Sequence, residues 1–257
     1  MPVYVKRHGS GARAFLALHG WAGNHRTFDD LLPFVPEGAS FYSADLPGYG
    51  QTPAPVDRSV EGILNPILEA IDQVGGHPIT LVGYCGGALL ALECARRKPE
   101  GIARIVAIDP FAYLPWYLKV FTHPTWGRHA YMGTFANPVG RWLVNSAVGQ
   151  RRTTNPDPTG AFKRVNHDVA YEHLLGVAEL SPGDRFAGLR VPVDITYGEH
   201  TFGAVRASAD IWRRILPQMR AFELRGAGHE PAREAPRQLA DVIFNPDEAE
   251  GLAGLSG

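Results

Sequence analysis

Cys85 has the strongest signs of chemical function in this chain of 257 residues. It lies in Gly83-Tyr84-Cys85-Gly86-Gly87, after an apolar run and before a stretch with helical spacing. Glycines two residues before and two residues after a reactive residue permit a sharp turn that presents its side chain above the sheet. A thiol at the start of a helix lies in a positive potential, which favours the nucleophilic thiolate. The spacing therefore predicts a cysteine nucleophile that attacks activated carbonyl groups.

A nucleophile of this kind needs a base, and His229 is the best candidate among the ten histidines. It follows the short loop Gly226-Ala227-Gly228, which comes after an apolar run ending at Leu224. A histidine can accept the thiol proton and later donate it to the leaving group. Cys94, the second cysteine, lies inside the helix predicted after Cys85, and we expect it to be a small core residue.

The elements that must position these residues alternate between short apolar runs and longer segments of helical period. This alternation is typical of a parallel sheet with crossover helices. Strands are predicted at Ala14 to Leu18, Phe41 to Ala44, Ile79 to Val82, Ile102 to Ile108, Val193 to Tyr197 and Ala221 to Leu224. Helices are predicted at Thr27 to Phe34, Val60 to Val74, Ala88 to Arg97, Ala204 to Leu216 and Pro236 to Phe244. Val3 to Arg7 is expected to lead in as an antiparallel hairpin, and the tail from Asn245 to fray.

The segment 110–181 is too long for a simple crossover, and prolines at 115, 124, 138, 156 and 158 interrupt it. We interpret it as a helical lid inserted into a core made of residues 1–109 and 182–257. Eleven of the 26 aromatic residues fall in this segment, which favours an apolar cavity beneath the lid, although such residues could also pack the lid onto the core. The predicted pocket residues are Tyr84, Phe111, Trp116, Trp126 and Trp142.

Composition and charge exclude several classes of function. The chain has 25 basic and 26 acidic residues, so its net charge of −1 attracts neither nucleic acid nor an anionic membrane. A hydrophobic fraction of 45% with 20% charged residues is typical of a soluble globular protein, and no transmembrane run is present. Two cysteines cannot form a disulfide framework, and the N-terminus lacks a secretory pattern, so we expect a reducing cytoplasm. The expected partner is a small-molecule acyl substrate, with no metal and no other cofactor.

Four motifs, in order along the chain, resemble those of the α/β-hydrolase fold family over essentially the whole sequence. They are Leu18-His19-Gly20-Trp21-Ala22, Asp45-Leu46-Pro47-Gly48-Tyr49-Gly50, the turn around Cys85, and Gly228-His229. The resemblance implies a mostly parallel sheet flanked by helices, with an inserted helical lid. It also implies a catalytic triad, and an oxyanion hole made of the backbone N–H groups of Trp21 and Gly86. His19 and Asp45 are expected to hold loops by hydrogen bonds.

The acid that orients His229 is the point at which the chain departs from the family pattern. After the strand ending at Tyr197 the family usually has Gly-x-x-Asp, whereas this chain has Gly198-Glu199-His200-Thr201. Asp109 ends the preceding strand, where haloalkane dehalogenases and certain lipases carry the acid, and it is the preferred candidate. Glu199, or no acid at all, remain alternatives. With Asp109, the chain keeps the family order of nucleophile, acid and histidine.

The cysteine nucleophile also selects among reactions. Attack of Cys85 on a haloalkane would leave a thioether that water cannot cleave, so dehalogenation is disfavoured. We predict hydrolysis of a carboxylic ester, lactone or thioester with an apolar acyl part, through a covalent acyl-enzyme on Cys85. Acyl transfer at the same site is an alternative, because the Gly-x-Cys-x-Gly box resembles that of polyhydroxyalkanoate synthases. Those enzymes are much longer and have a glycine where this chain has Ala88. A non-catalytic ligand-binding member of the fold is a third interpretation.

Overall fold

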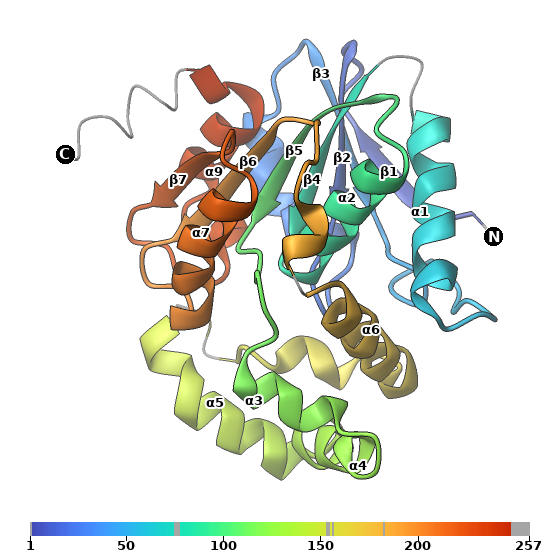
Figure 1. Ribbon diagram of the computed structural model, residues 1–257, viewed down its shortest axis with the longest axis vertical. Coiled ribbons are helices and arrows are strands. Elements are labelled where there is room, and N and C mark those ends of the chain that lie inside the picture. Colours follow the sequence, from blue (N-terminus) through green and yellow to red (C-terminus); the bar gives the residue numbers. More distant parts are fainter. Residues whose placement is uncertain (1, 75–77, 153–154, 156, 182, 248–257) are drawn as a thin grey trace.

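A seven-stranded, mostly parallel sheet forms the centre of this computed structural model, which describes residues 2–74, 78–152, 155, 157–181 and 183–247 (Figure 1). The strands are β1 (Val5–His8), β2 (Arg13–Leu18), β3 (Ala39–Ala44), β4 (Ile79–Tyr84), β5 (Ile102–Ile108), β6 (Val193–Gly198) and β7 (Arg220–Leu224). Their spatial order is β1-β3-β2-β4-β5-β6-β7. The six strands predicted after the N-terminal hairpin are confirmed, and their ends differ from the prediction by at most two residues.

The N-terminal strand corrects one prediction. β1 does not form a hairpin with β2; it pairs antiparallel with β3, with Val5 opposite Ala44 and His8 opposite Phe41. The physical reason is that β2 already has parallel partners on both sides, β3 and β4. The free edge of β3 is therefore the place where the N-terminal strand can add its backbone hydrogen bonds.

Helices cover both faces of the sheet. The α-helices are α1 (Val60–Val74), α2 (Gly86–Arg97), α3 (Trp116–Lys119), α4 (Gly127–Tyr131), α5 (Pro138–Arg152), α6 (His167–Leu180), α7 (Gly203–Ile215), α8 (Pro231–Glu234) and α9 (Pro236–Phe244). The helix predicted at Thr27 to Phe34 is instead a 3-10 helix, His25–Phe34, which contains Pro33. Asn24 starts it: its side chain accepts a hydrogen bond from the N–H of Arg26. The other four predicted helices are confirmed within two residues at each end.

Two apolar layers sandwich the sheet, as expected for parallel strands that are buried on both faces. On one face, α9 and the 3-10 helix pack against the sheet through Phe28, Phe41 and Phe244. On the other face, α1, α2 and α7 belong to a core that includes Leu64, Leu90 and Trp212. Residues 248–257, most of the tail predicted to fray, lie outside the described residues.

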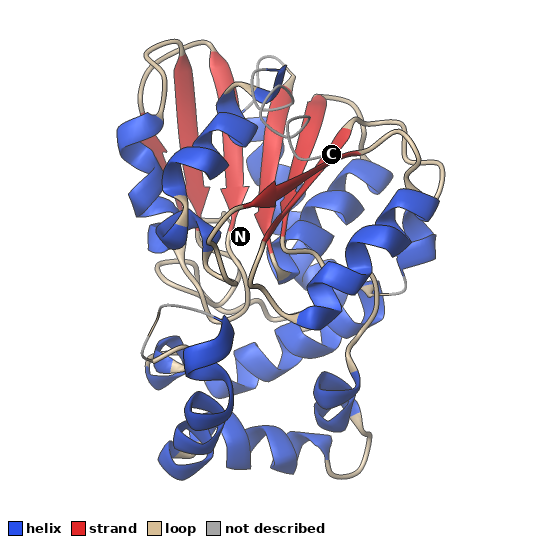
Figure 2. Cartoon of the chain, turned by 90° about the vertical axis from the view of Figure 1, so that its left-hand side faces the viewer, coloured by secondary structure: helices blue, strands red, loops and turns tan. Residues whose placement is uncertain are grey.

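The described part of segment 110–181 contains α3 to α6 between β5 and β6, with a π-helical turn at Met132–Ala136. Figures 1 and 2 show these helices together, beyond the carboxyl ends of the parallel strands. Two polar contacts join α6 to the core. His173 Nε2 in α6 donates to the carbonyl of Pro47 (2.8 Å), and Glu172 in α6 pairs with Arg58 (2.9 Å). The helical structure expected here is present, and a role as a lid remains a prediction.

No helix in the described part of the chain is both long enough and apolar enough to cross a membrane.

Candidate active site

Cys85 lies in a strained turn between β4 and α2. Its φ of 52° and ψ of −114° are unusual for a residue with a side chain, and its N–H donates to the carbonyl of Ile108 (2.8 Å) at the end of β5. Backbone strain of this kind costs of the order of 1–3 kcal/mol and persists only where the surrounding structure enforces it. The turn thus holds the thiol at the carboxyl edge of the sheet and at the first turn of α2.

The flanking glycines are required by close backbone approach. A Cβ on Gly83 would lie 2.5 Å from the Cα of Ala88, and a Cβ on Gly87 would lie 2.4 Å from the carbonyl oxygen of His19. Real Cβ atoms are not found at such distances from backbone atoms. The glycine pattern seen in the sequence is therefore explained by packing of the turn against the start of α2 and the end of β2.

The structure brings Asp109 and His229 into direct contact. Asp109 follows β5, His229 follows β7, and the Oδ2 atom of Asp109 lies 2.7 Å from Nδ1 of His229. The Asp109 side chain is fully buried, and that of His229 is 18% exposed. Cys85 also lies close enough to His229 to raise the pKa of the imidazole. His229 therefore interacts with both Asp109 and Cys85.

Asp109 is held in place by its backbone and by further donors. Its φ is 50°, and its N–H donates to the carbonyl of Thr196 (2.8 Å). The N–H of Gly198 donates to Oδ1 (3.2 Å), and the hydroxyl of Thr201 donates to Oδ2 (2.6 Å). These contacts direct the carboxylate toward the imidazole.

Glu199, the alternative acid, faces elsewhere. Its Oε2 atom accepts a hydrogen bond from the N–H of Gly226 (2.8 Å) and lies 3.9 Å from Nε2 of His200. Its side chain is 42% exposed. Of the two carboxylates considered from the sequence, Asp109 is therefore the one that contacts His229.

Opposing effects set the pKa of His229. Burial lowers it, but hydrogen bonds to Asp109 and Cys85, together with the charges of those two groups, raise it to about 10. The imidazole is therefore protonated near neutral pH and carries a proton that it can donate to a leaving group.

Several contacts around His229 were not predicted from the sequence. The hydroxyl of Tyr84 donates to the His229 carbonyl, and burial raises the pKa of Tyr84 well above its usual value, so that the phenol keeps its proton. The ring of Phe202 lies edge-on to the imidazole at 4.7 Å. Glu234 accepts hydrogen bonds from the N–H groups of Gly228 (2.7 Å) and Glu230 (3.1 Å). The contacts of Tyr84 and Phe202 with His229 link distant segments, so the sequence carried no local signal for them.

The two residues predicted to supply the oxyanion hole belong to segments next to Cys85. Gly86 is the first residue of α2, and a Cβ on it would lie 3.0 Å from Cγ2 of Val177 in α6. The loop containing Trp21 packs against the turn, because a Cβ on Gly20 would lie 3.2 Å from the Cβ of Cys85. N–H groups at a helix start and in an adjacent loop can stabilise a negative oxygen.

The predicted pocket residues fall into two groups. Tyr84 and Phe111 lie near the imidazole, with ring centroids 5.5 Å and 6.4 Å from that of His229. The other three residues are exposed: Trp116 over 77% of its surface, Trp126 over 44% and Trp142 over 65%. Their role as pocket residues is still a prediction.

An aromatic cluster that the sequence did not single out includes Trp21, in the loop after β2. The indole of Trp21 packs edge-on against Phe135 (4.9 Å) and Phe162 (4.8 Å), and its Nε1 donates to the carbonyl of Ala170 in α6 (2.7 Å). Phe135 and Phe162 stack on each other at 4.6 Å. This cluster joins the helices of segment 110–181 to the loop after β2.

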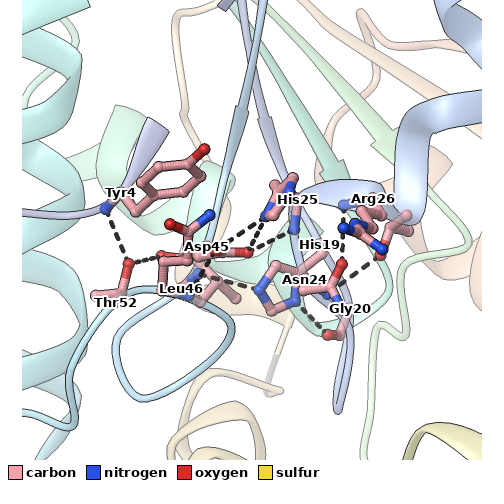
Figure 3. A network of polar contacts seen from close by, with 11 residues as sticks. Tyr4, His19, Gly20, Asn24, His25, Arg26, Asp45, Leu46 and Thr52 are labelled. Atoms are coloured by element: carbon pink, nitrogen blue, oxygen red, sulfur yellow. Dashed lines mark hydrogen bonds and ion pairs between the residues drawn. The ribbon is translucent and has the colours of Figure 1, made fainter. Parts of the chain in front are cut away.

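The conspicuous polar residues His19 and Asp45 hold loops, as expected. Figure 3 shows the Asp45 carboxylate accepting hydrogen bonds from the N–H and the imidazole of His25 (2.6 and 2.9 Å). His19 Nε2 accepts from the N–H of Leu46 (3.0 Å), and its Nδ1 donates to the carbonyl of Gly20 (2.8 Å). Burial lowers the pKa of His19 to about 4, so this imidazole is neutral.

Two further observations concern the second cysteine and groups of side chains that could bind a metal ion. Cys94 is fully buried in α2, and burial raises the pKa of its thiol to about 12, so it is not a competing nucleophile. Among the residues that the structure describes, no group of three or more His, Cys, Asp or Glu side chains is arranged to hold a metal ion.

Comparisons with known proteins identify relatives named as esterases and solved structures with a similar fold. The chain is 25% identical over 256 residues to a pimeloyl-[acyl-carrier protein] methyl ester esterase of Neisseria meningitidis, covering 93% of this chain and 80% of the relative. A protein of the same name from Aeromonas hydrophila is 24% identical, with 95% and 98% covered. Among solved structures, a thermophilic esterase from Thermogutta terrifontis superposes with a TM-score of 0.77 at 17% identity, covering 96% of this chain and 93% of that one.

A broader family comparison covers most of the chain. The family model described as the alpha/beta hydrolase fold matches residues 13–236, which include the turn around Cys85, Asp109 and His229. With its parallel sheet, its helices on both faces and this match, the chain belongs to the α/β-hydrolase fold family.

Proposed function

We propose that this protein is a carboxylic ester hydrolase that forms an acyl-enzyme on Cys85. The observation that carries the proposal is the contact of His229 with Asp109 at the same edge of the sheet as the strained turn that holds Cys85. The two relatives described above are named as methyl ester esterases, which supports ester hydrolysis as the reaction class.

In the first half of the reaction, the Cys85 thiolate attacks the ester carbonyl carbon. A C–S bond forms, and the carbonyl π electrons move to the oxygen. The oxyanion collapses, the bond between carbon and the ester oxygen breaks, and protonated His229 donates its proton to the departing alcohol. The products of this half are the alcohol and a thioester on Cys85.

In the second half, neutral His229 accepts a proton from water, and the hydroxide attacks the thioester carbonyl. The C–S bond breaks, the acid leaves, and the thiolate is restored beside a protonated imidazole. Asp109 keeps the imidazole oriented through both halves and stabilises its positive charge.

The oxyanion formed in each half needs donors that are already in place. Gly86, at the start of α2, and Trp21, in the loop packed against the turn, are the proposed sources of two backbone N–H groups. One such donor contributes of the order of 3–4 kcal/mol to transition-state stabilisation.

The surroundings favour an apolar acyl group. Trp21, Phe135 and Phe162 form an aromatic cluster at the loop after β2, and a Cβ added to Gly86 would lie 3.0 Å from Cγ2 of Val177 in α6. The relatives' names specify methyl esters, which supports a small alcohol as the leaving group. We therefore propose that helices α3 to α6 act as a lid over an apolar acyl site.

Incubation with a panel of p-nitrophenyl and methyl esters of increasing acyl length tests this proposal. We expect release of free acid, a burst of p-nitrophenol equal to the enzyme concentration, and an acyl adduct on Cys85 in intact-protein mass spectrometry. Cys85→Ala should lose both the burst and the adduct, whereas the matched variant Cys94→Ala should retain both.

The adduct should persist in His229→Ala, because the second half of the reaction needs the imidazole. Folded protein that forms no adduct and releases no acid from any ester would overturn the proposal. If esters or amides accumulate in place of free acid when alcohols or amines are added, the enzyme is an acyltransferase instead.

A further inference from the structure

Thr201 occupies the position at which the family usually has its acid, and its hydroxyl contacts two members of the proposed triad. Its Oγ1 lies 2.6 Å from Oδ2 of Asp109 and 3.3 Å from Nδ1 of His229. Thr201 is fully buried. The hydroxyl and the imidazole therefore meet at the same carboxylate oxygen.

The directions of the hydrogen bonds follow from the chemistry of the three groups. An ionised carboxylate can only accept, so the hydroxyl of Thr201 and Nδ1–H of His229 both donate to Oδ2 of Asp109. Bonds in which the acceptor is charged are stronger than neutral ones. The hydroxyl thereby holds the oxygen on which the orientation of the imidazole depends.

The position of Thr201 is itself fixed by the turn after β6. Its N–H donates to the carbonyl of Gly198 (3.1 Å), and the N–H of Gly198 donates to the other carboxylate oxygen of Asp109 (3.2 Å). The turn from Gly198 to Thr201 therefore donates a hydrogen bond to each oxygen of the Asp109 carboxylate. The imidazole approaches Oδ2 as the third donor.

Asp109 needs these hydrogen bonds to fix its side chain, because its backbone is strained. A φ of 50° is in the left-handed region, which residues with a side chain rarely occupy. A carboxylate on such a backbone that lost one donor would gain freedom to rotate away from the imidazole.

We propose that Thr201 is a positioning residue for the reaction at Cys85: its hydroxyl holds the Asp109 carboxylate in the orientation that aligns His229 with the thiol. The expected effect of Thr201 on kcat rests on the proposed function. Its expected effect on the alkylation of Cys85 rests on the geometry alone.

The test compares Thr201→Val, which removes the hydroxyl at nearly constant volume, with Thr201→Ser, which keeps it. All variants carry Cys94→Ala, so that iodoacetamide reports on Cys85 alone. We expect Thr201→Val to lower kcat for a p-nitrophenyl ester about 10- to 100-fold, the range for hydrogen bonds to charged groups, with little change in KM. It should also shift the pH profile of alkylation in the same direction as Asp109→Ala. Thr201→Ser should restore kcat and the profile.

A double-mutant cycle separates positioning from a purely structural role. If the hydroxyl acts through Asp109, Thr201→Val should have no further effect on kcat or on the alkylation profile in an Asp109→Ala background. An equal loss in both backgrounds, or a Thr201→Val protein with unchanged kcat and profile, would overturn the inference.

The measurement of Cys85 alkylation by iodoacetamide does not depend on ester hydrolysis. A wild-type protein that hydrolyses no ester, but whose alkylation profile moves in Thr201→Val and returns in Thr201→Ser, would refute the proposed function and leave the positioning role intact. Ester hydrolysis that is unaffected by Thr201→Val would refute the positioning role alone.

Discussion

Oδ2 of Asp109 lies 2.7 Å from Nδ1 of His229, although 120 positions separate the two residues in the chain. They meet because β5 and β7 lie on either side of β6 and run parallel, so their carboxyl ends share one edge of the sheet. The same edge carries Cys85 at the end of β4, which is paired with β5. The fold thus gathers three separate loops around one imidazole.

Replacing Asp109 by asparagine is expected to lower kcat for an activated ester about 1,000-fold or more. The amide has no negative charge to stabilise the imidazolium, and it can hold the imidazole in the wrong tautomer. Steady-state kinetics measure the effect, with Glu199→Gln as the matched control. The control should keep wild-type kcat, because Glu199 contacts Gly226 and not His229. A large loss in the control and none in Asp109→Asn would reverse the assignment.

Replacing Cys85 by serine is expected to lower kcat at least about 100-fold. Serine forms no stabilised anion near neutral pH and depends wholly on His229 to remove its proton, a contribution of about 10²- to 10⁴-fold. The site instead keeps its imidazole protonated beside a thiol. Burst kinetics with a p-nitrophenyl ester measure the change. A serine variant as active as the wild type would contradict a site adapted to a thiolate.

The pH profile of kcat/KM is expected to fall on the alkaline side near pH 10. Burial lowers the pKa of His229, but Asp109 and Cys85 raise it to about 10, so the proton needed by the leaving alcohol is lost only above that pH. Removing the carboxylate charge in Asp109→Asn takes away one raising influence. The alkaline limb should then move to lower pH, and a limb that stays in place would show that another group sets it.

Gly87→Ala is expected to destabilise the protein by about 2 kcal/mol or more. The new Cβ would lie 2.4 Å from the backbone carbonyl oxygens of Leu18 and His19, which cannot move without distorting β2 and the loop after it. Urea unfolding measures the loss. Gly133→Ala is the matched control, because nothing lies within 4 Å of the position that its new Cβ would take, and its free energy of unfolding should change little.

Stability is expected to fall as the pH drops from about 6.5 to 4, in part because of His173. Burial lowers the pKa of His173 to about 4, so the unfolded chain takes up a proton in this range before the folded protein does. The folded state therefore loses roughly 3 kcal/mol from this group between the two pKa values. In His173→Gln, urea unfolding across this range should show a smaller decline, whereas replacing the exposed His129 should leave the wild-type decline unchanged.

Much of the fold and part of the site could be predicted from the sequence because their causes are local. The apolar run before Cys85 and the glycines around it specify a strand, a turn and a helix within a few residues. Gly228-His229 is a similar short signal. The strand and helix order follows from the alternation of two hydrophobic periods, each of which is visible in a short window.

Tertiary structure decided what depends on contacts between distant segments. Asp109 and Glu199 both follow strands that end at the same edge, so spacing could not tell which carboxylate turns toward His229. The backbone at Asp109 and the donors Gly198 and Thr201 decide it. Aromatic residues are abundant throughout segment 110–181, and composition could not tell that Phe135 and Phe162 pack on Trp21 while Trp116 and Trp142 are exposed.

The sequence by itself determined the fold class, the nucleophile candidate and the histidine candidate, since each is encoded by neighbouring residues. Only the tertiary structure decided the partner of β1, the carboxylate that contacts the imidazole and the place of Thr201 beside it. The physical reason is that hydrogen bonds between loops depend on which strands lie side by side, and strand order is a property of the packed sheet.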